Sequence, residues 1–284
     1  MSSVINIQNL HHSYGTKQIY AGLNLKIEAG SVFGLLGKNG VGKSTLINIL
    51  MGHLRPNSGQ CLVFGERSHN LSPETRSRIA LLYEGFTSYD AMNIIQIEHF
   101  FAIFYPRWQS KVFYELIELM DVHMEQRLSS LSFGQKSQVV LGLLLAQNAE
   151  LLILDDYSMG LDAGYRRLFV DYLKDYLQGT NKTVLMTSHV MNDLEHLVDQ
   201  IAIVDRSTDV YLDSMDHFCS QFRCFESLQE PPASDLIRRC EKNQNRFQLY
   251  SLAEQKTLEQ KLNLTIIEKP LTFEEKFLGF VGKY

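Results

Sequence analysis

The residues with the clearest chemical potential form a glycine-rich segment near the amino end of the chain. Gly37 to Thr45 reads GKNGVGKST and fits the pattern G-x-x-x-x-G-K-[ST], between an apolar run typical of a strand and one typical of a helix. Glycines let successive backbone N–H groups point at phosphate oxygens, and the helix that follows adds the positive end of its dipole. The segment therefore predicts a cradle for a nucleoside triphosphate.

Two side chains of this cradle have distinct expected roles. Lys43 supplies a cationic point charge for the β and γ phosphates, and the Ser44 hydroxyl is placed to bind Mg²⁺. The other residues that we expect around the phosphates are Gly37, Asn39, Gly40, Gly42 and Thr45. Kinases, GTPases and helicases share such a cradle, so it does not by itself identify the reaction.

The elements that must position the cradle are an alternation of strands and helices. Four short, nearly continuous apolar runs have the length of strands buried on both faces, which predicts a parallel central sheet. These runs are Val32 to Leu36, Leu151 to Leu154, Thr183 to Met186 and Ile201 to Val204. Residues 1–30 alternate in strand fashion around a turn at Tyr14-Gly15, which indicates an antiparallel ribbon. The pattern predicts an α/β fold with right-handed crossovers.

Two segments depart from this alternation. Residues 85–147 have mostly helical spacing and are too long for a simple crossover between the first two of these strands. After about residue 215, Pro231-Pro232 breaks the chain, and short strand-like pieces alternate with polar, helix-forming stretches. We therefore expect a large domain over residues 1–214, with a helical subdomain at about 85–147, and a small C-terminal α/β accessory domain over 215–284.

Composition limits the classes of partner. The net charge is -5, from 27 basic and 32 acidic side chains, so the chain has no surplus of cations for a phosphate backbone, and we expect no nucleic-acid partner. Four widely spaced cysteines without a CxxC pair favour free thiols in a reducing compartment. The start has no signal-peptide pattern, and no apolar run approaches the roughly 20 residues of a membrane span. We expect a cytoplasmic protein that reaches a membrane only through a partner.

A second motif narrows the class. Leu131-Ser132-Phe133-Gly134-Gln135 lies shortly before the apolar strand that ends in Asp155-Asp156. In this order and spacing, and over about residues 4–205, the chain resembles the ABC ATPases. That family has a P-loop NTPase core, an antiparallel β subdomain and a helical subdomain that carries an LSGGQ-like signature. Phe133 stands in place of the first glycine of the signature, at a position that varies in the family.

The resemblance implies a role for each matching residue. Tyr14 would stack on adenine, Asp155 would hold Mg²⁺ through water, and His189 would contact the γ-phosphate. Plain packing of an aromatic and a satisfied polar histidine are the alternatives for Tyr14 and His189. In this family the signature faces away from its own cradle, which implies a head-to-tail dimer, as homodimer or heterodimer, around two MgATP. The residues that would contact the ATP or subunit opposite are Ser132, Gly134, Gln135 and Asp162 of the D-loop.

Two positions depart from the family pattern. Asp156 stands where the family usually has glutamate, the base that orients or deprotonates the attacking water. Aspartate is shorter by one methylene, and general-base catalysis needs hydrogen-bond contact, so this site is expected to hydrolyse slowly or to be the weak half of a heterodimer. Glu84 stands where the family has the Q-loop glutamine; a carboxylate still binds Mg²⁺, although it adds negative charge beside the triphosphate. The alternative is that Glu84 is an exposed loop acid.

An aromatic stretch after Glu84 bears on the partner. The run Phe104-Tyr105-Pro106-Arg107-Trp108 looks like stand-alone cassettes of bacterial exporters, in which this region receives a helix of the membrane subunit. Core packing is the alternative. The resemblance implies an ATP-hydrolysing subunit on the inner face of the membrane that drives a separately encoded permease. Soluble ABC proteins of translation, DNA repair or iron-sulfur assembly are the rival class.

Overall fold

The computed structural model describes residues 3–83, 89–120, 122–158, 161–188, 190–205 and 210–282. Their contacts divide the chain into two compact units, one of residues 1–198 and 202–211 and the other of residues 199–201 and 212–284. Across the described ranges, no helix is both long and apolar enough to cross a membrane.

The central sheet of the chain has six strands in the order β10-β9-β3-β8-β7-β6. Its strands are β3 (Val32–Gly37), β6 (Ile79–Leu82), β7 (Leu151–Leu154), β8 (Thr183–Met186), β9 (Gln200–Val204) and β10 (Val210–Ser214). β3 pairs in parallel with β8, β8 with β7, and β7 with β6. Every residue of β3, β7 and β8 is buried, as the continuous apolar runs predict. The expected central sheet is confirmed, and β6 and β10 extend it.

An antiparallel sheet accompanies the central one in the first unit. Its order is β2-β1-β4-β5, formed by β1 (Ser3–Tyr14), β2 (Lys17–Glu28), β4 (Ser58–Val63) and β5 (Glu66–Arg67). The hairpin closes with Tyr14 opposite Lys17, so the turn places Tyr14 at the end of its strand. The predicted ribbon is confirmed.

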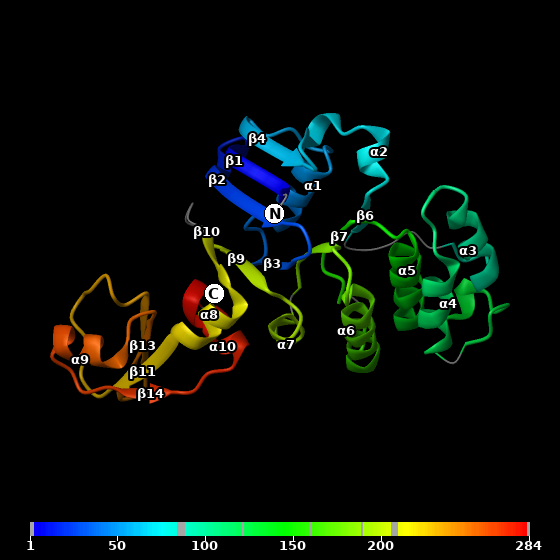
Figure 1. Ribbon diagram of the computed structural model, residues 1–284. Coiled ribbons are helices and arrows are strands. Elements are labelled where there is room, and N and C mark those ends of the chain that lie inside the picture. Colours follow the sequence, from blue (N-terminus) through cyan, green and yellow to red (C-terminus); the bar gives the residue numbers. More distant parts are fainter. Residues whose placement is uncertain are drawn as a thin grey trace. The chain divides into compact units, whose positions relative to one another are not determined.

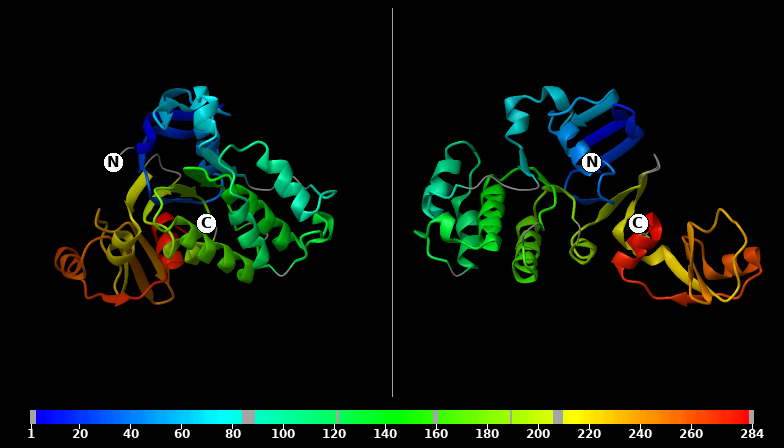
Figure 2. Two further views of the ribbon diagram at one scale, coloured as in Figure 1. Left: turned by 45° about the vertical axis from the view of Figure 1, so that its right-hand side comes forward. Right: turned by 180° about the vertical axis from the view of Figure 1, so that it is seen from behind.

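Helices occupy the connections between these strands (Figure 1). α1 (Lys43–Leu50) follows β3, and α2 (Pro73–Arg76) precedes β6. The described residues between β6 and β7 form three α-helices, α3 (Ile94–Ala102), α4 (Ser110–Glu118) and α5 (Phe133–Ala146). They share an apolar core that includes Phe113, Ile117 and Leu143, and both views in Figure 2 show them side by side. α6 (Ala163–Leu177) and α7 (Met191–Glu195) follow β7 and β8.

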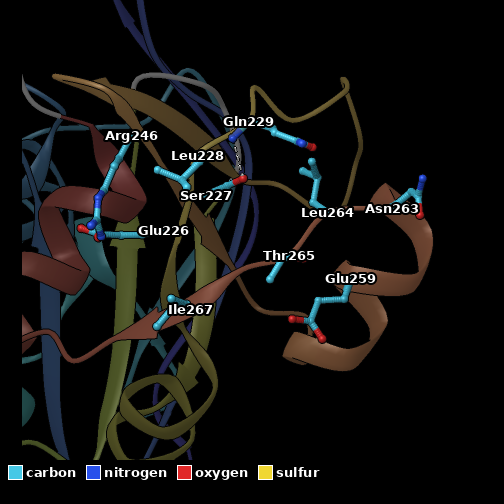
Figure 3. A pocket seen from close by; sticks show the side chains of 10 residues that line it. All are labelled: Glu226, Ser227, Leu228, Gln229, Arg246, Glu259, Asn263, Leu264, Thr265 and Ile267. Atoms are coloured by element: carbon cyan, nitrogen blue, oxygen red, sulfur yellow. Dashed lines mark hydrogen bonds and ion pairs between the residues drawn. The ribbon is translucent and has the colours of Figure 1, made fainter.

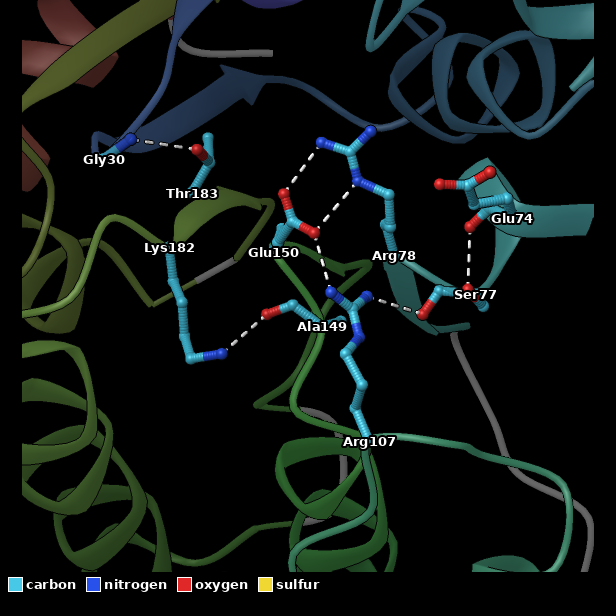
Figure 4. A network of polar contacts seen from close by, with 9 residues as sticks. All are labelled: Gly30, Glu74, Ser77, Arg78, Arg107, Ala149, Glu150, Lys182 and Thr183. Atoms are coloured by element: carbon cyan, nitrogen blue, oxygen red, sulfur yellow. Dashed lines mark hydrogen bonds and ion pairs between the residues drawn. The ribbon is translucent and has the colours of Figure 1, made fainter. Parts of the chain in front are cut away.

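A polar network fastens the helical segment to the amino ends of the sheet strands (Figure 4). Arg78 binds Glu150 through two hydrogen bonds of 2.8 and 2.9 Å, and Arg107 donates to the same carboxylate at 2.7 Å. Arg107 also donates to the Ser77 carbonyl at 3.0 Å. Arg107 belongs to the aromatic run between α3 and α4, whereas Arg78 and Glu150 directly precede β6 and β7. The two guanidinium groups lower the pKa of Glu150 to about 2.

Replacing Glu150 by glutamine is expected to destabilise the protein near neutral pH. The folded-state pKa lies below the ordinary value, so the stabilisation is present above about pH 4.3 and is lost as the pH falls toward 2. The side chain is 41% exposed, so we expect on the order of 1 kcal/mol after allowing for solvent screening. Urea unfolding at pH 7 and pH 3 checks this, because the difference between wild type and variant must shrink at the lower pH. An equal difference at both pH values would contradict the assignment.

The second unit has its own four-stranded antiparallel sheet, with the order β12-β13-β11-β14. Its strands are β11 (Arg223–Ser227), β12 (Arg239–Asn243), β13 (Arg246–Ser251) and β14 (Ile267–Lys269), and its helices are α8 (Met215–Gln221), α9 (Gln255–Leu262) and α10 (Phe273–Val281). Phe225, Leu249 and Leu258 belong to one apolar cluster of this unit. A hollow of about 460 Å³ lies between the ion pair of Glu226 with Arg246 and the end of α9 (Figure 3).

Candidate active site

A cavity of about 370 Å³ opens in the first unit beside the start of α1. It brings together most of the expected site residues, and Lys17, Ile19 and Thr187 join them. The expected residues that line it are Tyr14, Asn39, Gly40, Gly42, Lys43, Ser44, Thr45, Asp155 and Asp156. Gly37 is buried beneath the cradle, where a Cβ would lie 2.6 Å from the Val204 carbonyl oxygen.

The turn between β3 and α1 has a backbone course that glycine makes possible. Gly42 has φ 119°, and an added Cβ would lie 2.5 Å from Ile19 Cγ2. The buried Tyr20 hydroxyl donates to the Gly42 carbonyl at 2.9 Å, which fixes the turn from below. The Lys43 ammonium donates to the carbonyls of Gly37 and Lys38 at 2.7 and 3.1 Å, so it is held over the loop that would receive phosphates.

Two carboxylates follow β7 at the opposite side of the same cavity. Asp155 is only 4% exposed, and its amide donates to the Leu82 carbonyl of β6. The Thr187 hydroxyl donates to Asp155 Oδ1 at 2.8 Å and accepts the Asp156 amide at 2.9 Å. Thr187 follows β8, so parallel neighbours β7 and β8 end in one polar cluster. Sequence reasoning missed Thr187 as a site residue, although its place directly after an apolar strand is the same signal that identified Asp155.

Asp156 has an unusual backbone. Its φ of 49° lies in the left-handed region, which aspartate and asparagine adopt more readily than other non-glycine residues. Ser158 Oγ donates to Asp156 Oδ1 at 3.0 Å, which orients the carboxylate. The conformation and this bond together hold Asp156 in the wall of the cavity.

The cavity offers a set of donors that suits a hard cation. The Ser44 hydroxyl and the Asp155 carboxylate line the same space, and both are oxygen ligands of the kind that Mg²⁺ prefers. Asp155 is buried, and among the described residues its carboxylate accepts a hydrogen bond from the Thr187 hydroxyl alone, which leaves lone pairs for a metal-bound water. These residues fit Mg²⁺ bound together with phosphate oxygens.

Tyr14 lies at the open rim of the cavity with 51% of its surface exposed. The buried His12 ring packs against the Tyr14 ring at right angles, with 4.9 Å between ring centroids. The Tyr14 hydroxyl lies 3.5 Å from Thr45 Oγ1. A half-exposed, braced ring can receive a flat base by stacking.

The residues of the signature lie elsewhere and do not line this cavity. Ser132 caps α5, since its hydroxyl accepts the Gln135 amide at 3.2 Å and Gln135 Oε1 accepts the Ser132 amide at 2.9 Å. Asp162 caps α6 through one bond, with its carboxylate accepting the Tyr165 amide. Gly134 is required locally, because a Cβ would lie 2.9 Å from the Tyr165 ring. A single chain therefore does not bring the signature to its own cradle.

Two expected catalytic residues cannot be placed. Glu84 and His189 both lie outside the described residues, as do Met159 and Gly160 of the D-loop. Their neighbours Tyr83 and Ser188 are described, and Ser188 Oγ lies 3.3 Å from Ser158 Oγ, beside the Asp156 carboxylate. The roles of Glu84 and His189 stay predictions.

Residues 20–158 match the family described as ABC transporter. This chain carries an ABC transporter ATP-binding domain. The match includes the whole cradle, the signature and both carboxylates after β7. The presence of the domain confirms the expected family and a fold with a P-loop core.

Two curated relatives indicate which ABC proteins resemble this one. A Nod factor export ATP-binding protein I of Rhizobium meliloti strain 1021 is 31% identical over 208 residues, which cover 71% of this chain and 61% of that protein. The bacitracin transport ATP-binding protein BcrA of Bacillus licheniformis is 29% identical over 239 residues, which cover 81% of this chain and 76% of that protein.

Solved structures agree on the fold of the ABC domain. The ATP-binding subunit of an ABC transporter superposes with a TM-score of 0.66 at 19% identity, covering 77% of this chain and 92% of that one. The cbiO1 protein of Clostridium perfringens, part of the ABC transporter complex cbiONQ, gives a TM-score of 0.65 at 21% identity, covering 78% of this chain and 92% of that one.

Proposed function

We propose that this chain binds and hydrolyses MgATP and uses that cycle to drive a separately encoded membrane permease, as an exporter-type subunit. The observation that carries the proposal is the cavity in which Lys43, Ser44 and Asp155 meet. Lys43 neutralises the β and γ phosphates, and backbone N–H groups of the glycine-rich turn and α1 bind their oxygens. Mg²⁺, when bound at Ser44 and Asp155, supplies charge stabilisation at those oxygens.

Hydrolysis in this proposal depends on Asp156. The Asp156 carboxylate orients the attacking water or accepts a proton from it, and the Ser158 hydroxyl orients that carboxylate by donating a hydrogen bond to Oδ1. Because aspartate is shorter than the glutamate usual at this position, the reaction is slow. The weak half of a heterodimer is the second candidate, and the same shortened side chain is what favours it.

The complete site in this proposal needs two chains. Ser132, Gly134 and Gln135 stand at the amino end of α5, where N–H groups and the helix dipole favour a phosphate, and they do not line the cavity of their own chain. A head-to-tail dimer, of two copies or of this chain with a second cassette, places each signature on the ATP in the opposite cradle, with Asp162 beside it.

Replacing Ser132 by arginine is expected to abolish ATP-dependent dimerisation while leaving ATP binding to the single chain intact. The bulky cation obstructs the close approach of the opposite nucleotide, whereas Ser132 lies outside the cavity. Sedimentation with Mg²⁺ and a non-hydrolysable ATP analogue should show a species of twice the monomer mass for wild type only. Ser214→Arg is the matched control, since it removes a helix cap of the second unit. Loss of dimers in Ser214→Arg, or formation of dimers by Ser132→Arg, would contradict the head-to-tail dimer around ATP.

The permease partner in this proposal docks on the helical segment. Ile103 and Phe104, at the end of α3, are 81% and 63% exposed, and Phe100 is exposed beside them. Three exposed apolar side chains close together in the sequence suit a helix of a membrane subunit. We place the chain in the cytoplasm, peripheral to the inner face of the membrane. Co-purification with a multi-span membrane protein from detergent extracts tests the partner, and a chain that only copurifies with soluble proteins would favour the rival class.

The proposal assigns residues 1–214 to the ATPase domain and residues 215–284 to an accessory domain. The two compact units support this boundary to within a few residues. In this proposal the permease determines cargo and direction.

A further inference from the structure

A chain of hydrogen bonds links α1 to the end of β6. Asn48 Nδ2 donates to the Ser44 carbonyl at 2.8 Å, and the Tyr83 hydroxyl donates to Asn48 Oδ1 at 3.3 Å. The Tyr83 hydroxyl also bonds to His53 Nδ1. The rings of Tyr83 and His53 are stacked, with 5.9 Å between centroids and 28° between planes. The amide of His53 in turn donates to the Asn48 carbonyl at 2.9 Å.

The proton positions along this chain follow from the chemistry of the groups. A phenol has one hydrogen to donate, and Asn48 Oδ1 can only accept it. His53 must therefore be the donor to Tyr83, with its proton on Nδ1. The direction of donation runs from His53 to Tyr83, to Asn48 and to the Ser44 carbonyl, with each donor satisfied once.

The chain of hydrogen bonds connects the backbones of the two candidate Mg²⁺-binding residues, Ser44 and Asp155. One end reaches the backbone of Ser44, and the other end is Tyr83, which directly follows Leu82. The Leu82 carbonyl accepts the Asp155 amide at 2.9 Å. Ser44 and Asp155, the two described candidates for Mg²⁺ binding, are thus joined through hydrogen bonds. Ser44 and Asp155 belong to different elements, since Ser44 lies in α1 after β3, Asp155 follows β7, and β8 lies between these two strands in the sheet.

We propose that Asn48, Tyr83 and His53 are positioning residues that fix the separation of Ser44 and Asp155 for Mg²⁺, an inference that rests on the proposed function. None of the three lines the cavity. They act through the backbone of residues that do, in the manner of outer-sphere groups around metal ligands.

Tyr83→Phe tests the proposal, since it removes the hydroxyl and keeps the stacked ring. Calorimetric titration with ATP is made at increasing Mg²⁺ and, separately, in EDTA. ATP binding tightens as Mg²⁺ is added, and we expect the Mg²⁺ concentration that gives half of this effect to rise about three- to tenfold in Tyr83→Phe. This change is near the lower end of the effects that outer-sphere residues have on metal affinity. The affinity for metal-free ATP is expected to stay within about twofold, because phosphate binding by the cradle does not depend on Tyr83.

A double-mutant cycle separates positioning from general packing. His53→Leu should raise the Mg²⁺ requirement in the wild-type background and add nothing in the Tyr83→Phe background, since His53 acts through the phenol. Tyr176→Phe is the matched control, because its hydroxyl donates to the Leu145 carbonyl at 3.0 Å away from the cavity. An unchanged Mg²⁺ requirement in Tyr83→Phe, an equal loss of metal-free ATP affinity, or additive effects in the cycle would overturn the inference alone. Wild-type protein that takes up no ATP under either condition would overturn the proposed function and this inference with it.

Discussion

Lys43→Ala is expected to weaken MgATP binding by at least about 100-fold, which is the largest single effect that the site predicts. The ammonium is the one described cation held by the carbonyls of the glycine-rich turn itself, at 2.7 and 3.1 Å from Gly37 and Lys38. Its removal leaves the triphosphate charge facing two carboxylates, Asp155 and Asp156, with one fewer cation in the cavity to offset it. Equilibrium binding of a fluorescent ATP analogue measures the change.

A matched control separates loss of charge from loss of structure in this experiment. Lys26→Ala removes an exposed lysine that is paired with Glu28 on β2, far along the strand from the hairpin that carries Tyr14. It should bind MgATP as wild type does, and both variants should unfold at similar urea concentrations. Retained binding in Lys43→Ala would mean that the nucleotide enters elsewhere.

Asp156→Asn is expected to lower ATP turnover by at least about 100-fold while leaving MgATP affinity nearly unchanged. The substitution removes the acidic oxygen that orients or deprotonates water, and it keeps the shape of the side chain. Asparagine also adopts the left-handed backbone that residue 156 requires, with φ 49°, so the fold is not put under new strain. Steady-state phosphate release and ATP binding, measured on the same preparation, give the two quantities.

Asp156→Glu examines the length of this side chain. The longer carboxylate is expected to raise turnover severalfold, because it closes the distance to the attacking water. Glutamate tolerates a left-handed backbone less well than aspartate, so stability should fall by about 1 kcal/mol in the same variant. Turnover equal to or below that of wild type would show that the shorter side chain is not what limits hydrolysis, and the degenerate half-site would then be the better account.

The central sheet and the cradle could be predicted because each is encoded locally. Leu151–Leu154 is apolar at every position and Thr183–Met186 at every position after Thr183, a pattern typical of a strand covered on both faces, and both lie in the sheet as expected. The glycine pattern of the cradle similarly reflects local geometry, as the φ of Gly42 and the contacts of its missing Cβ show. Local patterns of this kind identify elements without knowledge of their neighbours.

The site residue and the strands that the sequence did not predict depend on contacts between segments distant in the chain. Thr187 joins Asp155 and Asp156 only because β7 and β8 are neighbours in the sheet, an arrangement that no local pattern specifies. β12 was missed because Arg239–Asn243 is polar and pairs at the edge of its sheet, where little of it is buried. The strand-like run Leu264 to Ile267 contributes only its last residue to β14 (Ile267–Lys269), since Leu264 and Ile266 belong to the apolar cluster that includes Leu258 of α9.

The most direct measurement of the central claim is a calorimetric titration of the purified wild-type chain with MgATP. The account predicts saturable binding with close to one ATP per chain, weakened by at least about 100-fold in Lys43→Ala and retained in Asp156→Asn. Absence of saturable binding at millimolar MgATP, or binding that Lys43→Ala leaves intact, would contradict it.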